Sequence, residues 1–227
     1  MKLYNVIHQV PSKFLDIAFR FFADNKFLVS LPADDVVKYG LSKGQELTEA
    51  LLQTISAVSH YGKLLSAALH FLSYRQRTEW EIRQYLIKKA KSENSAEDVG
   101  EELIKQVKEK LKQLGLIDDQ KFARTYIEEK RRIANPKGDR AIKAELVRKG
   151  IDKKIIDEEL GRQEENSQIS QLSLARGALQ KRIKNKELRV KGIEQVKEKA
   201  RLLRFLAGRG FSYETSYKAI EEVLGME

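Results

Sequence analysis

The residues of this chain best suited to chemistry are clusters of lysine and arginine. One cluster surrounds a proline and holds Arg131, Arg132, Lys137, Arg140 and Lys143. Across residues 176–191 Glu187 is the one acid, and the candidate cations there are Arg176, Lys181, Arg182, Lys184 and Lys186. Cations at this density can neutralise phosphates and release counterions, or dock on an acidic protein surface. A solvated helix face remains the alternative for any single residue.

Some aromatic residues stand next to these or other bases. Tyr74 lies beside Arg75 and Arg77, and both Phe205 and Phe211 lie close to arginines. Such pairs could stack on the bases of a nucleic acid. Phe205 and Phe211 also follow the helix-packing pattern described below, which favours a position in the core. Arg75 and Arg77 therefore join the candidate contact residues.

The sequence offers no positive sign of catalysis. It has no Cys and three His, none at metal-ligand spacing with another. It contains no GxxxxGK[ST], GxGxxG or GxSxG motif. Asp118 and Asp119 stand where a helix should start, so helix capping explains them. The other paired acids, including Glu158 and Glu159, are interpreted as solvated helix faces. We expect no catalytic residue, no metal site, no cofactor and no enzymatic activity.

A pattern that recurs every 60 residues predicts the elements that carry these cations. An apolar pair four residues apart is followed by a base and a small residue, at Ile82-Leu86-Lys89-Ala90, Ile142-Leu146-Lys149-Gly150 and Leu202-Leu206-Arg209-Gly210. Each copy is typical of a helix that ends at a small residue. Asp152 and Ser212 can then cap a following helix. The period predicts three helices in each repeat, and repeats of this kind form extended surfaces.

Composition and charge set the broad class. The net charge is +10, of which residues 166–227 contribute 13 bases against 7 acids. A concentrated positive field indicates a polyanion or an acidic protein as partner. The absence of Cys, of a signal-peptide core and of a long apolar run leads us to expect a cytoplasmic protein without a membrane partner.

The first 61 residues differ from the rest and predict a small β-containing cap. Alternation over residues 15–21 and the apolar run 27–31 predict two strands, followed by a short helix near residues 34–39 and another after residue 47. The fold class we expect is mainly α, with three tandem three-helix repeats in an elongated array behind this cap. The predicted repeats span residues 62–117 (helices near 62–75, 78–90 and 96–114), 118–165, and 166–227 (helices near 168–188, 193–208 and 212–224).

Several segments resemble the RecX family of regulatory proteins. The central segment, residues 115–126 (GLIDDQKFARTY), is similar to the family signature, as is KGDRAIKAELVRKGI at residues 137–151. LRFLAGRGFS at residues 203–212 resembles the ending of the family's third repeat, and Arg75, Arg77, Thr78, Glu81, Ile82 and Leu86 resemble its first-repeat helix. The resemblance covers nearly the whole chain and follows the repeats in order. Ala90 departs from the glycine of the other two repeats.

The resemblance implies a modulator of the RecA recombinase. Members of the family bind the RecA filament on single-stranded DNA, suppress its ATPase and strand exchange, and also bind DNA alone. The implied partners are the RecA filament and single-stranded DNA, with double-stranded DNA as a further candidate, and we expect a monomer. The alternatives are a general nucleic-acid-binding helical repeat protein and an enzyme whose site carries no known motif. Binding to protein-free DNA at physiological salt distinguishes the first, and activity screens distinguish the second.

Overall fold

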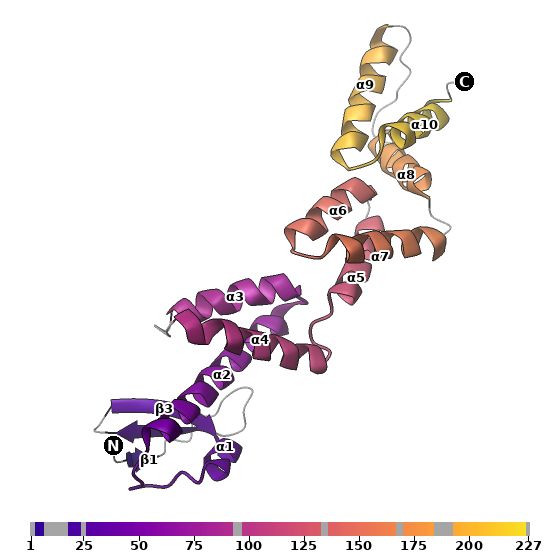
Figure 1. Ribbon diagram of the computed structural model, residues 1–227. Helices are drawn as coiled ribbons and strands as arrows, with labels where there is room; N and C mark the ends of the chain where they lie inside the picture. The colour runs from indigo at the N-terminus through magenta and orange to yellow at the C-terminus, as the bar shows by residue number, and fades with distance from the viewer. Residues whose placement is uncertain are drawn as a thin grey trace. The chain divides into compact units, whose positions relative to one another are not determined.

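The computed structural model describes residues 3–6, 18–23, 26–92, 97–132, 136–166, 170–183 and 193–225. These residues form a small sheet and a succession of helices (Figure 1). They group into two compact units. The described residues of the first unit lie within Met1–Arg77 and Glu81–Ile117, and those of the second lie within Thr78–Trp80 and Asp118–Glu227.

The sheet of the first unit is antiparallel, in the order β1-β2-β3, with strands β1 (Leu3–Val6), β2 (Ala18–Ala23) and β3 (Lys26–Pro32). Val29 and Leu31 alternate along β3 and are buried, as is Phe21, which pairs with Val29. The predicted pair of strands is confirmed. Residues 15–17 of the first predicted strand lie outside the described residues, and β1 is an addition to the prediction.

Helix α1 (Ala33–Lys38) matches the predicted short helix, whereas α2 (Glu49–Tyr74) is longer than predicted. We expected separate helices on either side of residue 61, but α2 runs through it without a break. Thr48 caps α2 by accepting a 3.3 Å hydrogen bond from the Leu51 amide. A lone glycine inside a helix costs only about 1 kcal/mol, so Gly62 does not end it. The predicted cap and first repeat therefore share α2.

Helices α3 (Glu79–Ser92) and α4 (Glu97–Gln113) complete the first unit. Figure 1 shows α2 extending from the sheet to α4. Ile82 and Leu86 of α3 are fully buried together with Val107 and Leu111 of α4. The apolar pair of the first repeat therefore lies in a core, as predicted. The predicted loop at residues 92–95 falls largely on residues outside the described part of the chain.

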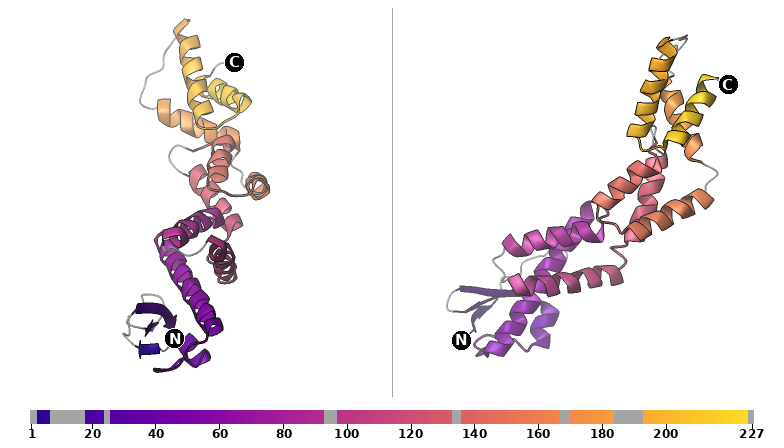
Figure 2. Two further views of the ribbon diagram at one scale, coloured as in Figure 1. Left: turned by 60° about the vertical axis from the view of Figure 1, so that its left-hand side comes forward. Right: turned by 45° about the horizontal axis from the view of Figure 1, so that its top comes forward.

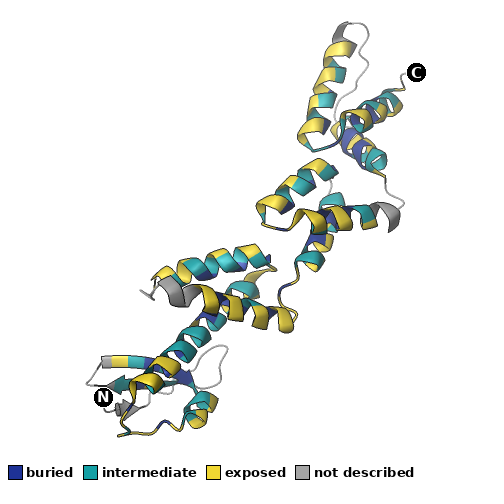
Figure 3. Cartoon of the chain, in the orientation of Figure 1, coloured by how far each residue is buried: buried dark blue, intermediate teal, exposed yellow. Residues whose placement is uncertain are grey.

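The second unit contains two successive groups of helices. The first group is α5 (Asp119–Arg132), α6 (Asp139–Arg148) and α7 (Lys153–Asn166), and the second is α8 (Gln171–Ile183), α9 (Ile193–Gly208) and α10 (Tyr213–Leu224). The members of the second group stay together in every view (Figure 2). The buried residues of α8 and α10 lie where these two helices face each other (Figure 3). The long helix predicted over residues 168–188 is described as α8 from Gln171 to Ile183, and the rest of the prediction, from residue 184, falls outside the described residues.

The repeated apolar pairs and glycine stops are confirmed in this unit. Leu146 and Leu206 are fully buried in separate cores. Gly150 and Gly210 have φ angles of +78° and +87°, the left-handed conformation that closes a helix. The Ile151 amide donates to the Leu146 carbonyl at 3.2 Å, and the Phe211 amide donates to the Leu206 carbonyl at the same distance. Each stop is therefore a Schellman motif, which satisfies carbonyls that the end of a helix leaves free.

Both glycine stops also allow close packing against the start of another helix. A Cβ built on Gly210 would lie 2.3 Å from the Ala141 nitrogen, and one built on Gly150 would lie 2.3 Å from the Trp80 Cβ. The Gly138 amide donates to the Arg209 carbonyl at 2.9 Å, and the Arg140 amide donates to the Gly210 carbonyl at 3.3 Å. The start of α6 thus supplies amides to carbonyls at the end of α9, so each helix end satisfies groups left over on the other.

Candidate functional site

Five of the predicted contact residues form close ion pairs with acids. The pairs are Arg75–Glu81 at 3.0 Å, Arg131–Asp139 at 2.8 Å, Arg176–Glu222 at 2.9 Å, Lys137–Glu145 and Lys143–Asp157. The Arg131 side chain is only 7% exposed, so little of it can meet a ligand. The other four pairs are partly exposed, and their cations can still contact an anion from outside. Such surface pairs stabilise a fold by little, roughly 0–1 kcal/mol each.

A second set of predicted cations has no carboxylate partner within the described residues. Arg140, Lys181 and Arg182 are exposed and belong to this set. Arg132 is outside this set because it lies 3.9 Å from Glu128, but that pair is loose and the Arg132 side chain is 82% exposed. These residues are best placed to neutralise a ligand, because no carboxylate in the described part of the chain forms an ion pair with Arg140, Lys181 or Arg182. Lys184 and Lys186 lie outside the described residues.

Arg77 behaves differently from its neighbour Arg75. Its guanidinium carbon lies 4.0 Å from the centroid of the Phe71 ring, a cation–π contact. Burial, and then the like charge of Arg75, lowers the pKa of Arg77. Tyr74 is 70% exposed, and its hydroxyl lies 3.0 Å from His70 Nε2. Arg77 therefore packs within the fold, whereas Tyr74 presents its ring to solvent.

A polar network on α5 and α6 fixes the position of Lys137. Glu145 receives hydrogen bonds from Lys137 and, at 2.8 Å, from the Tyr126 hydroxyl. Burial alone would raise the pKa of Glu145, but these two hydrogen bonds bring it below its ordinary value. Burial, and then the bond to Glu145, raises the pKa of Tyr126. The network therefore keeps a carboxylate charged in the wall of the hollow described next.

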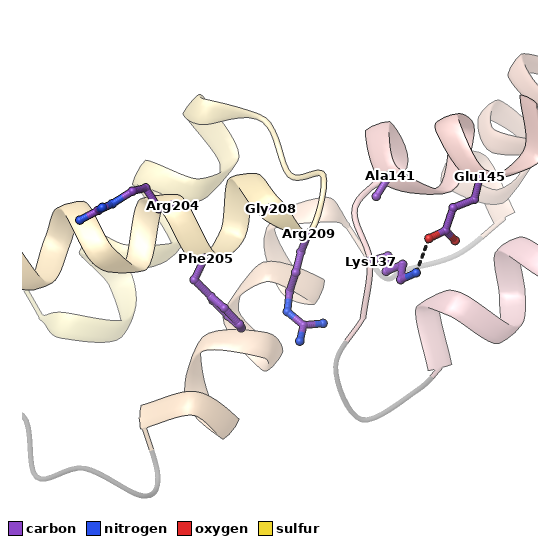
Figure 4. Close-up of a pocket in the computed structure, with 7 residues that line it drawn as sticks. All are labelled: Lys137, Ala141, Glu145, Arg204, Phe205, Gly208 and Arg209. Carbon is purple, nitrogen blue, oxygen red and sulfur yellow. Dashed lines mark hydrogen bonds and ion pairs between the residues drawn. The ribbon is translucent and has the colours of Figure 1, made fainter. Parts of the chain in front are cut away.

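This hollow, of about 470 Å³, lies between the start of α6 and the end of α9. Its lining combines cations with one acid and one aromatic ring: Lys137, Ala141, Glu145, Arg204, Phe205, Gly208 and Arg209 (Figure 4). The Arg182 and Arg209 guanidinium carbons lie 4.2 and 4.8 Å from the Phe205 ring centroid. In Figure 4, Phe205 and Arg209 project in the same direction, whereas Arg204 extends away from Arg209. The arrangement can hold an anion next to flat stacking surfaces.

The sequence identified only part of this lining. Lys137 was a candidate, but Arg204 and Arg209 were not, although Arg209 occupies the base position of the 60-residue pattern. Its equivalent Lys149 lies 5.6 Å from the Phe122 centroid and 5.7 Å from the Tyr126 centroid. The base of the pattern therefore contacts aromatic rings in both repeats. The repetition itself was the signal that could have identified Arg209.

The interpretation of Glu158 and Glu159 as a solvated pair was wrong for Glu159. Its side chain is 1% exposed and forms ion pairs with Arg124 at 3.0 Å and Arg162 at 2.8 Å. The hydrogen bond from Arg124 lowers the pKa of this carboxyl. Burial is possible because two guanidiniums replace the water that the carboxylate loses. The capping role expected of Asp118 is confirmed, since it accepts a 2.8 Å hydrogen bond from the Lys121 amide.

The described residues include no group of three or more potential ligands for a metal ion. No described helix is both long and apolar enough to cross a membrane. The fold and the site define a class of binding proteins, in which three-helix domains follow one another and present basic and aromatic side chains. Comparison with known proteins identifies the family within this class.

Two family models match the chain, the first three-helix domain of RecX at residues 65–103 and the second at residues 118–160. "Regulatory protein RecX" from Bacillus velezensis (strain FZB42) is 32% identical over 204 residues, which cover 90% of this chain and 72% of that protein. The protein of the same name from Streptococcus sanguinis (strain SK36) is 30% identical over 87% of this chain and 71% of that protein. The chain belongs to the RecX family of regulatory proteins.

Solved structures agree on the fold. A crystal structure of regulatory protein RecX matches with a TM-score of 0.64 at 24% identity, over 99% of this chain and 98% of that chain. The crystal structure of RecX from Lactobacillus salivarius matches with a TM-score of 0.54 at 25% identity, over 74% of this chain and 98% of that chain. Both describe the arrangement of helices to which this chain is similar.

Proposed function

We propose that this protein binds the filament that the RecA recombinase forms on single-stranded DNA, and reduces its ATPase and strand exchange. The observation that carries the proposal is family membership, supported by regulatory RecX proteins that align with about nine-tenths of the chain. The regulation would require binding alone, with no catalytic step in this chain. We further propose that the protein acts in the cytoplasm as a monomer, and that it modulates recombination and DNA repair.

The charges of the second unit support a role for nucleic acid in this binding. Arg140, Lys181 and Arg182 add positive charge that no described carboxylate cancels. A filament offers both phosphates and protein surface, and several weak contacts along it add up to a strong one. We propose that these residues, together with Arg132, contact DNA, and that the paired cations Arg75, Arg176 and Lys143 contribute mainly to local structure.

The test is the ATPase of RecA on single-stranded DNA, measured while this protein is added. We expect hydrolysis to fall as the protein approaches the concentration of RecA, and the protein alone to hydrolyse no ATP. Strand exchange should fall in parallel. Unchanged RecA activity with excess folded protein would contradict the proposal. Tight binding to protein-free DNA at physiological salt, without an effect on RecA, would favour a general nucleic-acid-binding protein instead.

A further inference from the structure

The hollow between α6 and α9 concentrates positive charge around one ring. Lys137, Arg204 and Arg209 line the hollow, and Arg182, which is outside the lining, contacts the Phe205 ring together with Arg209. Glu145 is the one acid in the lining. The lining itself holds three cations and one carboxylate, so its formal charge is positive and it can attract an anion. The volume of about 470 Å³ is within the range of roughly 300–1,000 Å³ found for small-ligand pockets.

The cations are held in place before any ligand arrives. Lys137 is fixed by Glu145, which Tyr126 also holds. Arg209 stands directly before the Gly210 stop, and its carbonyl accepts a 2.9 Å hydrogen bond from the Gly138 amide, so its backbone cannot shift without breaking that contact. Burial, and then the like charge of Arg182, lowers the pKa of Arg209, as expected where guanidiniums converge. Preorganised cations bind an anion with a smaller loss of conformational entropy.

The lining favours a nucleotide over an acidic peptide. The Phe205 ring and the guanidiniums beside it are flat groups on which a nucleobase can stack. A nucleotide also carries donors on its base, and these can approach Glu145 while its phosphate remains near the guanidiniums.

We propose that this hollow binds one nucleotide unit of single-stranded DNA, with its phosphate on Arg182 and Arg209 and its base stacked on the group around Phe205. The inference deepens the proposed function and rests on it for the identity of the strand. The same phosphate chemistry could come from a free nucleotide, and the experiment separates these two sources.

The test compares Arg209→Gln with the wild type in binding of a short fluorescein-labelled oligothymidylate, followed by anisotropy at several salt concentrations. Arg201→Gln is the matched control, because Arg201 is an exposed arginine on α9 outside the lining and is paired with Glu198 at 2.8 Å. We expect Arg209→Gln to weaken binding several-fold and to reduce the slope of log affinity against log salt by about 0.7, the value for one lost phosphate contact on a single strand. The control should match the wild type in both.

A second measurement covers the outcome in which Arg209→Gln unfolds. Addition of a thymidine dinucleotide to ¹⁵N-labelled wild-type protein should shift the amide resonances of Ala141, Gly208 and Arg209. Equal shifts with thymidine monophosphate at the same concentration would assign the hollow to free nucleotides, and larger shifts with the dinucleotide would assign it to a strand. Shifts confined to other residues, or equal affinity and slope for both variants, would overturn the inference.

Two further outcomes separate this inference from the proposed function. An acidic peptide that shifts the same resonances while the dinucleotide does not would overturn the nucleotide assignment in favour of a protein ligand. Inhibition of RecA by Arg209→Gln at the wild-type level, without dinucleotide shifts in the wild type, would leave the proposed function standing and reject the hollow. Nucleotide binding in the hollow without any effect on RecA would support the inference about the hollow and contradict the proposed function.

Discussion

The amide of Gly138 donates a 2.9 Å hydrogen bond to the carbonyl of Arg209. Thr78 and Lys149 stand 60 residues before Gly138 and Arg209, and they make the equivalent contact. The hydroxyl of Thr78 donates a 2.6 Å hydrogen bond to the carbonyl of Lys149. In each case the donor precedes a helix and the acceptor stands one residue before a glycine stop. The second unit therefore uses the same joint twice, and the spacing of the repeats in the sequence determines which residues form it.

This joint leads to a prediction about Gly210. Gly210→Ala places a Cβ 2.5 Å from the Ala141 Cβ at a φ of +87°, so it should lower the free energy of unfolding by more than the 1–2 kcal/mol or so expected for left-handed strain alone. Gly177→Ala is the control, since its Cβ meets nothing within 4 Å inside α8, and it should stabilise by up to about 1 kcal/mol. Urea denaturation followed by circular dichroism measures both. Equal stability of the two variants would show that the joint tolerates a side chain.

The repeated leucines give a prediction about the cores. Leu146→Ala should lower the free energy of unfolding by about 2–5 kcal/mol, because Leu146 is fully buried and its removal leaves a cavity. Val147→Ala is the neighbouring control, and because Val147 is 40% exposed it should cost far less. The same comparison can be made at Leu86 and Leu206. A loss below about 1 kcal/mol at Leu146 would mean that the core collapses around the change.

Glu159 makes stability depend on pH. The hydrogen bond from Arg124 lowers the pKa of Glu159 in the folded state, so its stabilisation is complete above the unfolded pKa of about 4.3 and is lost as the pH falls through the folded pKa. Glu159→Gln should cost about 1–3 kcal/mol at neutral pH and should flatten this acid decline. Denaturation midpoints from pH 7 downward measure the effect, with the exposed Glu158→Gln as control. If Glu159→Gln loses stability at acid pH as steeply as the wild type, other carboxyl groups cause that loss.

The periodic features of the fold could be predicted from the sequence, because they depend on local rules. Leu86, Leu146 and Leu206 recur at a fixed spacing that predicts buried helix faces, and the glycines four residues after Leu146 and Leu206 predict helix stops. At Ala90, which replaces the glycine in the first repeat, α3 continues to Ser92. The continuity of α2 could not be predicted in the same way. Gly62 disfavours a helix locally, and packing of its neighbours outweighs that preference.

The candidate site was harder to predict for a different reason. Cations are visible in the sequence, but whether each is neutralised depends on acids distant in the chain, such as Glu222 for Arg176, which lies 46 residues away. Arg131 is an example of a basic residue in a dense cluster that turns out to be buried against Asp139. The role of Glu159 was missed because an isolated pair of glutamates has the same appearance whether it faces water or an arginine.

The last prediction concerns the exposed cations without carboxylate partners. Changing Arg140, Lys181 and Arg182 together to glutamine removes three positive charges while leaving the described ion pairs intact. Folding should be nearly unaffected, since exposed substitutions usually change stability by no more than about 0.5 kcal/mol. Binding to single-stranded DNA should weaken, and its dependence on salt should become shallower, because fewer counterions are released on association.

The matched control changes Lys88, Lys105 and Lys110 to glutamine. These are three exposed lysines of the first unit, so the control has the same net charge as the test variant. Plots of log affinity against log salt separate a local effect from one of total charge. If the cations of the second unit contact phosphates, only the test variant loses slope, by about 0.7 for each contact removed. If total charge alone attracts the DNA, both variants lose affinity by the same factor. If the plot for the test variant has the slope and the affinity of the wild type, these cations form a solvated face. Lys184 and Lys186 would then be the next pair to change.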